Sequence, residues 1–525
     1  MRNRKRPAGP KLTHRFGFLD AAAVFLLLAA AGAAALWWHW KNGYLLYYGD
    51  AEAHLAIARR VFDSRTPGLE QIGTVWLPLP HLLMLPFVGN ETLWRTGLGG
   101  SIPSSACFLL AGTFFYLAVR RLFASRLAGF SAVLLFALNP NLLYLQAIPM
   151  TESIFFAAFF ILFYATVWFR QSGSGWAAAL AAAATGAACL TRYEGWFLIP
   201  FLAIYFWLAH PARRISPVLI FTVLASAAPL AWLAHNWWHY GNALEFYDGP
   251  YSAKAIYQRA LDSGMARYPG DRDWSNAWVQ FQAAVRLCAG PGLAIAGIVG
   301  VGAALFQRAF WPLILLALPP LFYLMSIYSS GTPVFVPHLW PNSYYNTRYG
   351  MAAFPILVFA AAALVAAAPR RIRPLISLLV IAASVAPWVA YPRASSWICW
   401  KESEVNSATR REWTRQAALY LQEHYRKGDG IYSSFGDLAG IFRQAGIPLR
   451  EVLHEGNHPH WNAATARPDL FLWEQWAVAI SGDMVSTTLL RAGRQSPRYE
   501  CVKMIAVKGA PVIEIFRRAS QFKDP

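Results

Sequence analysis

Long uncharged stretches alternate with short polar segments along most of this chain. About 20 apolar residues are needed for a helix to cross the hydrocarbon core of a bilayer, where a helix satisfies its own backbone hydrogen bonds. The pattern predicts an all-α polytopic membrane protein with about eleven spans. We place them at 21–40, 98–119, 127–148, 153–169, 176–191, 195–209, 215–235, 283–306, 309–328, 351–369 and 374–391.

One apolar segment does not fit this series. The stretch "WLPLPHLLMLPFVG", residues 76–89, has fourteen residues and three prolines. That is too short to span a bilayer, and prolines are poorly tolerated inside a helix. We therefore predict an interfacial or re-entrant piece here.

The pattern changes after the last span. Residues 408–426 have the spacing of an amphipathic helix, residues 430–436 read as a short strand, and residues 499–518 read as two strands around a Lys-Gly-Ala-Pro turn. The chain is thus predicted to have two parts. Residues 1–391 form the transmembrane domain, and residues 392–525 form a soluble α/β domain.

The number and distribution of charged residues support the interpretation as a membrane protein and predict its orientation in the membrane. Only 14% of the residues are charged, against about a quarter in soluble proteins. The net charge of +19 does not indicate a nucleic-acid partner, because the basic residues lie in short clusters between apolar runs rather than in one patch. Such clusters mark cytoplasmic loops.

With a cytoplasmic N-terminus, the inner segments hold one acid, Asp20. They hold sixteen basic residues, namely Arg2, Arg4, Lys5, Arg6, Lys11, Arg15, Arg120, Arg121, Arg126, Arg170, Arg213, Arg214, Arg308, Arg370, Arg371 and Arg373. The outer side then holds residues 41–97, 236–282, 329–350 and the segment after 391. We predict a multi-pass cell-membrane protein with its C-terminal domain and its chemistry on the non-cytoplasmic face.

The conspicuous polar groups fall on that predicted outer side. They are Asp50, Glu52 and His54 after the first span, Glu152 before the fourth, Arg192 and Glu194 before the sixth, and His338, Arg348 and Tyr349 before the tenth. The spans themselves are nearly free of ionisable groups, which a proton- or ion-coupled transporter usually needs. This placement favours chemistry at the outer boundary.

An enzyme at that boundary needs a donor that reaches it. Nucleotide-activated donors are made in the cytosol, and the chain has neither a GxxxxGK[ST] loop nor a strand-linked GxGxxG motif. A sugar carried on a lipid phosphate meets the requirement. Its transfer needs a general base for the acceptor hydroxyl and a cation for the departing phosphate, roles that suit Asp50 and Arg348.

The acidic motif in the first outer loop, the proline-bearing piece after it and the outer "RYG" that opens a late span resemble the GT-C glycosyltransferase superfamily. The nearest relatives would be protein O-mannosyltransferases and lipid A aminoarabinose transferases. The resemblance covers about residues 15–391. It implies that Asp50 is the catalytic acid of the first loop, Glu52 its companion, and Arg348 the cation near the lipid phosphate. Glu152 is similar to an acid after the third span in some members.

The sequence departs from the family at one point and leaves a metal open. The motif is Asp-Ala-Glu, whereas the protein mannosyltransferases have adjacent Asp-Glu, which argues against a protein acceptor. If residues 50–52 are extended, Asp50 and Glu52 face the same way and could hold a hard divalent cation. If they are helical, Glu52 points elsewhere.

Structural roles compete with each functional one. Asp50 could cap a helix that starts after it, and Glu152 could cap the fourth span in competition with Thr151. Arg192 and Glu194 could form an ion pair that only stabilises the fold. Arg348 could simply anchor a helix end at the lipid headgroups, and His54 could be an ordinary interfacial histidine.

Three histidines and two cysteines in the C-terminal part are candidates for a zinc site and for a disulfide, respectively. His454, His458 and His460 lack a fourth zinc ligand at a familiar spacing. Cys399 and Cys501, both after the last span, could form a disulfide on an oxidising face, although sequence gives no distance between them.

The reading that unites these observations is an inverting membrane glycosyltransferase. It moves a sugar from a polyprenyl-phosphate donor to a hydroxyl acceptor on a lipid, glycan or protein, with Asp50 as base and Glu52 orienting the acceptor or binding a metal. The substrate-binding residues are Arg348, Glu152, His54, Tyr349, Arg192, Glu194 and His338. A transporter or flippase of a lipid-linked substrate is the main alternative, and a membrane assembly protein is a third.

Overall fold

The computed structural model describes residues 14–210, 215–329, 331–391, 396–492 and 498–519, with the backbone alone for 14–17 and 492. Several residues used to predict orientation lie outside this part: Arg2, Arg4, Lys5, Arg6, Lys11, Arg213 and Arg214. The predicted boundary between the two domains also falls there, at 392–395, so that division stays a prediction.

Within the described residues, seven helices are long and apolar enough to cross a membrane. They are α1 (His14–Lys41), α5 (Leu98–Phe123), α8 (Glu152–Ser172), α11 (Ile215–Tyr240), α16 (Phe310–Ser329), α18 (Arg373–Ala390), and α17 (Phe354–Ala367) together with the 3₁₀ turn η2 (Thr347–Ala353) that leads into it. Each coincides with a predicted span. The chain is a multi-pass membrane protein.

Two predicted spans are broken rather than straight. Residues 127–148 form α6 (Arg126–Ala137) and α7 (Pro140–Ala147), which bend by 66°, and residues 283–306 are shared between α14 (Trp274–Ala289) and α15 (Pro291–Phe306), which bend by 109°. Each break has a local cause. Asn139 caps α7 by accepting two backbone N–H bonds, and Gly290, at φ 80°, precedes a helix-starting proline.

The remaining apolar helices are shorter. The spans predicted at 176–191 and 195–209 are α9 (Gly175–Cys189) and α10 (Glu194–Ala209), and the proline-bearing piece forms α3 (Leu79–Val88). Counting each bent pair as one span gives nine in the described chain, so the predicted number of eleven is not established. The ten residues of α3 agree with the prediction that this piece does not cross.

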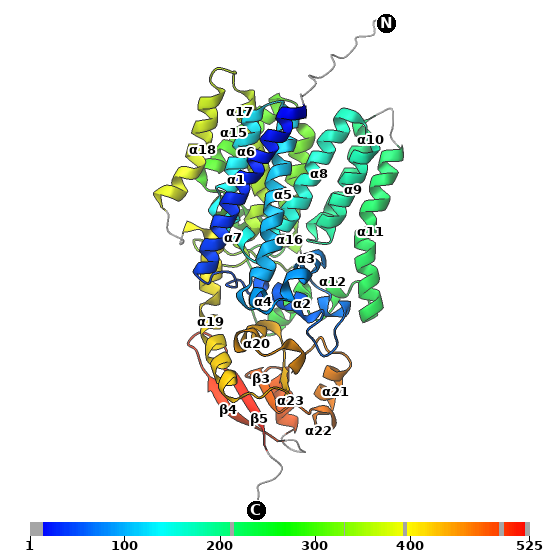
Figure 1. Cartoon of the computed structure of the whole chain (residues 1–525), viewed down its shortest axis with the longest axis vertical. Coiled ribbons are helices and arrows are strands. Elements are labelled where there is room, and N and C mark those ends of the chain that lie inside the picture. The colour runs from blue at the N-terminus through cyan, green and yellow to red at the C-terminus, as the bar shows by residue number, and fades with distance from the viewer. Residues whose placement is uncertain (1–13, 211–214, 330, 392–395, 493–497, 520–525) are drawn as a thin grey trace, which may run out of the picture.

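Loops lie at the two opposite ends of the helical bundle (Figure 1). At the end of the bundle where α1 begins, Asp20 forms ion pairs with Arg120 (2.7 Å) and Arg126, which joins α1 to the end of α5 and the start of α6. Figure 1 shows α2 (Gly49–Arg60), α3, α4 (Glu91–Thr96) and the C-terminal sheet at the opposite end. The single acid predicted on the inner side thus meets two of the basic residues predicted there.

The C-terminal part begins with α19 (Ile398–His424) and continues as a five-stranded mixed sheet in the order β2-β1-β3-β5-β4. The strands are β1 (Ile431–Ser433), β2 (Val452–Leu453), β3 (Trp476–Ile480), β4 (Tyr499–Ile505) and β5 (Ile513–Arg518). β1 is parallel to β2 and β3, whereas β5 is antiparallel to β3 and β4. The predicted helix, first strand and hairpin are all present, and β2 and β3 were not predicted.

Short helices complete the fold. On the sheet side these are α20 (Ala439–Ala445), α21 (His460–Ala466), α22 (Pro468–Phe471) and α23 (Met484–Ala492), with 3₁₀ turns at Gly436–Leu438 and Leu449–Glu451. On the bundle side they are η1 (Leu69–Ile72), α12 (Glu245–Asp248) and α13 (Ala253–Asp262).

One apolar core joins the sheet to the segment between α1 and α5. Leu55 of α2 and Trp94 of α4 are buried in the same cluster as Trp413, Phe442 and Trp476 from the C-terminal part. Burial of large aromatic side chains contributes strongly to such a contact. All five cysteines are free, so the pairing of Cys399 with Cys501 that the sequence left open is not formed.

Candidate active site

Asp50 lies in the first turn of α2 but does not cap it. The helix already begins at Gly49, its N-cap residue is Tyr48, and no side-chain cap bond forms. The capping role considered for Asp50 is therefore wrong. Its carboxylate instead forms an ion pair with Arg348, and its side chain is 38% exposed while that of Arg348 is 8% exposed. Asp50 is thus the solvent-reachable member of the pair.

Arg348 is brought to Asp50 by η2, the turn that opens α17. Its guanidinium lies between two aromatic rings, 5.0 Å from the centre of Tyr48 and 5.4 Å from that of Tyr349. Its Nε lies 3.4 Å from Oε1 of Glu152, the first residue of α8. Three segments, the start of α2, η2 and the start of α8, therefore meet at one cation, and such a buried arginine is more than a headgroup anchor.

Arg192 and Glu194 extend this network. Arg192 donates from Nε to Glu194 (2.6 Å), and from Nη1 to Glu152 (3.1 Å) and to the Thr151 hydroxyl (2.5 Å). The hydroxyl of Tyr323 donates to Glu194 at 2.8 Å. Arg192 and Glu194 do form the predicted ion pair, but Glu152 links it directly to Arg348.

Glu402 is a member of the site that the sequence reasoning missed. It lies in the first turns of α19, is 2% exposed, and has Oε1 3.7 Å from Nη1 of Arg348. Burial raises the pKa of its carboxyl above the usual value, against the pull of Arg348. One signal was available, because "SWICWKE" places this acid two residues after the apolar run 397–400 that follows the last span.

His54 lies on the same face of α2 as Asp50, one turn along. It is 3% exposed, its Nδ1 is 2.9 Å from Nε2 of His81, and its ring centre is 4.7 Å from that of Trp76. Burial, and then the positive charges of Arg348 and Arg192, lower the pKa of His54 to about 3. It is therefore a neutral side chain beneath the site at physiological pH.

Glu52 points away from this cluster. Its carboxylate accepts hydrogen bonds from Arg443 (2.7 Å) and Arg410 (3.2 Å), both in the C-terminal part. Residues 50 and 52 are both helical, so their side chains diverge by about 200° around α2. The extended arrangement that would have let Asp50 and Glu52 act together is absent.

A metal held by that pair does not fit this geometry, because two arginines already occupy the Glu52 carboxylate. Among the described residues no group of three or more His, Cys, Asp or Glu side chains could hold a metal ion. His454, His458 and His460 therefore form no such group. His454 is fully buried, whereas the other two are exposed.

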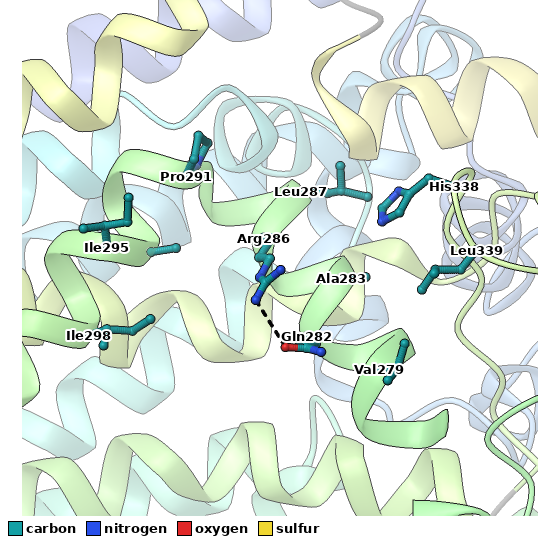
Figure 2. A pocket seen from close by; sticks show the side chains of 11 residues that line it. Val279, Gln282, Ala283, Arg286, Leu287, Pro291, Ile295, Ile298, His338 and Leu339 are labelled. Atoms are coloured by element: carbon teal, nitrogen blue, oxygen red, sulfur yellow. Dashed lines mark hydrogen bonds between the residues drawn. The ribbon is translucent and has the colours of Figure 1, made fainter. Parts of the chain in front are cut away.

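His338 lies elsewhere, in a cavity of about 570 Å³ between α14, the start of α15 and the segment before η2. Figure 2 shows Arg286 reaching toward Gln282, with His338 and Leu339 on one side and Ile295 and Ile298 on the other. The two isoleucines are 65% and 70% exposed. No described carboxylate lies within 4 Å of Arg286, so this groove combines an unpaired cation with an apolar wall.

The structure thus unites most of the predicted residues. Asp50, Arg348, Tyr349, Glu152, Arg192 and Glu194 form one connected cluster above His54, while Glu52 and His338 lie apart from it. The aromatic and hydroxyl partners Tyr48, Thr151 and Tyr323 had no recognisable signal in the sequence. They line the site only because distant loops meet there.

Comparison with known proteins gives a family match over part of the chain. The model of the dolichyl-phosphate-mannose-protein mannosyltransferase family matches residues 94–239. This segment contains Glu152, Arg192 and Glu194, but neither Asp50 nor Arg348. Among curated protein sequences none matches the chain significantly.

Solved structures give a likeness of fold. The structure of ArnT from Cupriavidus metallidurans bound to undecaprenyl phosphate matches with a TM-score of 0.52 and 13% identity, over 93% of this chain and 97% of that one. The apo oligosaccharyltransferase of Archaeoglobus fulgidus gives 0.46 and 11%, over 88% and 69%. The AglB oligosaccharyltransferase of that organism, in complex with an inhibitory peptide and a dolichol-phosphate, gives 0.43 and 12%, over 96% and 75%.

The family match and the ArnT fold confirm the predicted resemblance to GT-C glycosyltransferases. The likeness to ArnT extends over nearly the whole of both chains. It therefore includes the C-terminal part, which the sequence had left without a relative.

Proposed function

We propose that this protein is an inverting membrane glycosyltransferase that moves a sugar from a polyprenyl-phosphate donor to a hydroxyl acceptor. The observation that carries the proposal is the ion pair of Asp50 with Arg348 at one end of the helical bundle. It couples a reachable carboxylate to a buried cation, the two groups that such a transfer needs. Because basic loops favour the cytoplasmic side and lie at the opposite end of the bundle, the proposal puts the site on the non-cytoplasmic face.

The reaction follows from the two groups. Asp50 accepts the proton of the acceptor hydroxyl, whose oxygen attacks the anomeric carbon from the side opposite the phosphate. The bond from that carbon to the phosphate oxygen breaks, and the electron pair leaves with the lipid phosphate. Arg348 stabilises this anion with charge-assisted hydrogen bonds. The products are the glycosylated acceptor, the lipid phosphate and a protonated Asp50.

The ion pair also explains how the base is held before the donor binds. A donor phosphate competes with Asp50 for Arg348, so binding frees the carboxylate at the moment when it is needed. Glu152 stays on the other side of Arg348 and links it to Arg192. We assign Glu52 to docking of the C-terminal part, because both of its partners come from there.

The groove at Arg286 supports a lipid-borne donor. Its apolar wall on α15 is exposed on the bundle surface at Ile295 and Ile298, while Arg286 and His338 lie at its polar end. A polyprenyl chain fits the apolar wall, and a phosphate fits the polar end at Arg286 and His338. Gly350 of η2 packs against the backbone of Ala284 on α14, the helix that also lines the groove.

The test is transfer from defined polyprenyl-phosphate sugars by the purified protein. Asp50→Asn should lower the rate of transfer by about 10²- to 10⁴-fold, the contribution of a general base, with an unchanged unfolding temperature. Asp262→Asn is the matched control, because Asp262 is exposed on α13. Mass spectrometry of co-purified lipid should detect a polyprenyl phosphate.

Full transfer by the Asp50→Asn variant would remove Asp50 from the reaction. Movement of the intact lipid-linked substrate across vesicles without cleavage of the sugar–phosphate bond would favour the transporter alternative instead.

A further inference from the structure

The first turns of α19 are built into the active-site end of the helical bundle. The backbone N–H of Cys399 donates to Oδ1 of Asn141 (3.0 Å), and the hydroxyls of Ser403 and Tyr144 share a hydrogen bond of 2.8 Å. Asn141 and Tyr144 belong to α7, inside the bundle. This end of α19 is therefore fixed to the transmembrane helices and not only to the sheet that follows it.

Glu402 projects from this anchored turn onto the residues just before Arg348. Its Oε1 accepts the N–H of Asn346 (3.1 Å), and its Oε2 accepts the N–H of Thr347 (2.7 Å) and also the Thr347 hydroxyl. Both oxygens are thus occupied, and the whole carboxylate is buried. Asn346 has a left-handed backbone, φ 52°, a conformation that Asn adopts more readily than most residues.

We propose that Glu402 is a positioning residue that fixes the Asn346–Thr347 turn and thereby holds Arg348 in place for the donor phosphate. The proposal rests on the proposed function for the identity of that donor. It gives the C-terminal part a role in the reaction, because α19 carries Glu402.

Binding of the donor phosphate changes the partners of Arg348. Arg348 is held by Asp50 on one side, and that ion pair must loosen when the donor arrives. Besides its 3.7 Å contact with the guanidinium, Glu402 acts on the backbone that carries Arg348, through bonds to Asn346 and Thr347 that a donor does not replace. The guanidinium therefore keeps its place while its partner changes from carboxylate to phosphate. Displacement of a binding group by about 1 Å can cost 10²-fold in rate.

Two variants weaken this support at different points. Thr347→Val removes one donor to Glu402 with little change in volume, and Thr347→Ser restores it. Glu402→Gln keeps the shape but leaves one backbone N–H facing an amide NH₂ group. Glu404→Gln is the matched control, because Glu404 lies on the same helix, is 33% exposed and pairs with Lys401.

The experiment measures kcat and separate KM values for donor and acceptor in the full-length protein, together with its unfolding temperature. Thr347→Val and Glu402→Gln should lower kcat/KM for the donor by about 10- to 100-fold and raise the donor KM, with the acceptor KM unchanged. Thr347→Ser and Glu404→Gln should match the wild type. The double variant Thr347→Val with Glu402→Gln should lose no more than Glu402→Gln alone, because both act through one contact.

An unchanged donor kcat/KM in Thr347→Val and Glu402→Gln would overturn the inference, as would equal increases in both KM values. If the wild-type protein transfers no sugar, the proposed function fails, and binding of polyprenyl phosphate itself then tests the positioning role. Weaker binding by Thr347→Val than by Thr347→Ser would support that role. Equal binding, or no binding by the wild type, would exclude it.

Discussion

At the scale of single residues, the site is an arginine–carboxylate network in which each charge has several partners. Glu152 contacts both Arg192 and Arg348, and Glu194 also accepts a hydrogen bond from Tyr323. Removing one member of a buried pair is costly, because it leaves an uncompensated charge in a poorly solvated place. Function and stability are therefore coupled at these positions.

Arg192→Met tests that coupling. The variant leaves Glu152 with only Arg348 and Glu194 with only Tyr323, so we expect a loss of about 3–5 kcal/mol in the free energy of unfolding. Thermal unfolding in detergent measures it. The control is Arg170→Met, at the exposed far end of α8. Equal stability of the two variants would show that Arg192 is not a structural partner.

His454 gives the C-terminal part a pH dependence. Its Nδ1 accepts the N–H of Gly456 at 3.1 Å, and burial, with a contribution from Arg60 and Arg65, holds its pKa well below 6.5. The folded state then binds fewer protons than the unfolded state. Stability is complete above pH 6.5 and falls below it, with a slope of up to about 1.4 kcal/mol per pH unit.

Unfolding measured between pH 7.5 and 5 should show a steeper slope in the wild type than in His454→Phe, which keeps only the contribution of other buried histidines such as His54. Replacement of the exposed His460 by Gln should leave the slope unchanged. Equal slopes in the wild type and in His454→Phe would assign the whole effect to other groups.

At the scale of elements, the position of η2 against α14 decides where Arg348 lies. Cys288 of α14 donates its thiol to the carbonyl of Thr347 at 3.2 Å. A Cβ atom on Gly350 would lie 2.5 Å from the carbonyl carbon and oxygen of Ala284. Only glycine permits this approach of two backbones.

Gly350→Ala should therefore push η2 away from α14. We expect a loss of about 1–3 kcal/mol in unfolding free energy, together with reduced sugar transfer, because Arg348 moves with the turn. Gly302→Ala in α15 is the control. A Cβ there meets no atom within 4 Å, so the variant should be at least as stable as the wild type. Unfolding temperature and transfer rate check both, and normal transfer by Gly350→Ala would contradict the argument.

At the scale of the whole molecule, the C-terminal part and the segment between α1 and α5 form one unit. They share an apolar core, and Glu52 adds ion pairs to Arg410 of α19 and Arg443 of α20. Further along, Arg65 donates to Glu474 at 2.5 Å and Gln71 to the carbonyl of Gly456 at 2.8 Å. The helix that carries Asp50 is thus held between the bundle and the sheet.

Glu52→Ala should loosen this contact as a whole. Hydrogen exchange is expected to rise in α2, α19 and α20 together, since two buried arginines lose their shared partner. Glu423→Ala, at a side chain that is 78% exposed, is the control. If Glu52→Ala loses sugar transfer while hydrogen exchange is unchanged, Glu52 would instead be a catalytic residue.

The sequence alone determined the membrane class and the positions of most of the long apolar helices, and it predicted on which side of the membrane the polar groups lie. Hydrophobic length and the distribution of basic residues are local properties, so they are readable along the chain. The same holds for the hairpin at 499–518. The bends at Asn139 and Gly290 were missed, because an apolar run has the same composition whether it is straight or broken.

Only the tertiary structure decided which polar groups meet. Asp50 and Glu52 are two residues apart, yet one joins Arg348 and the other joins Arg410 and Arg443, because α2 begins before both and turns them to opposite sides. Glu402 reaches Arg348 across more than fifty positions through the anchoring of α19. Such contacts depend on how helices pack against one another, and no local pattern in the sequence records that packing.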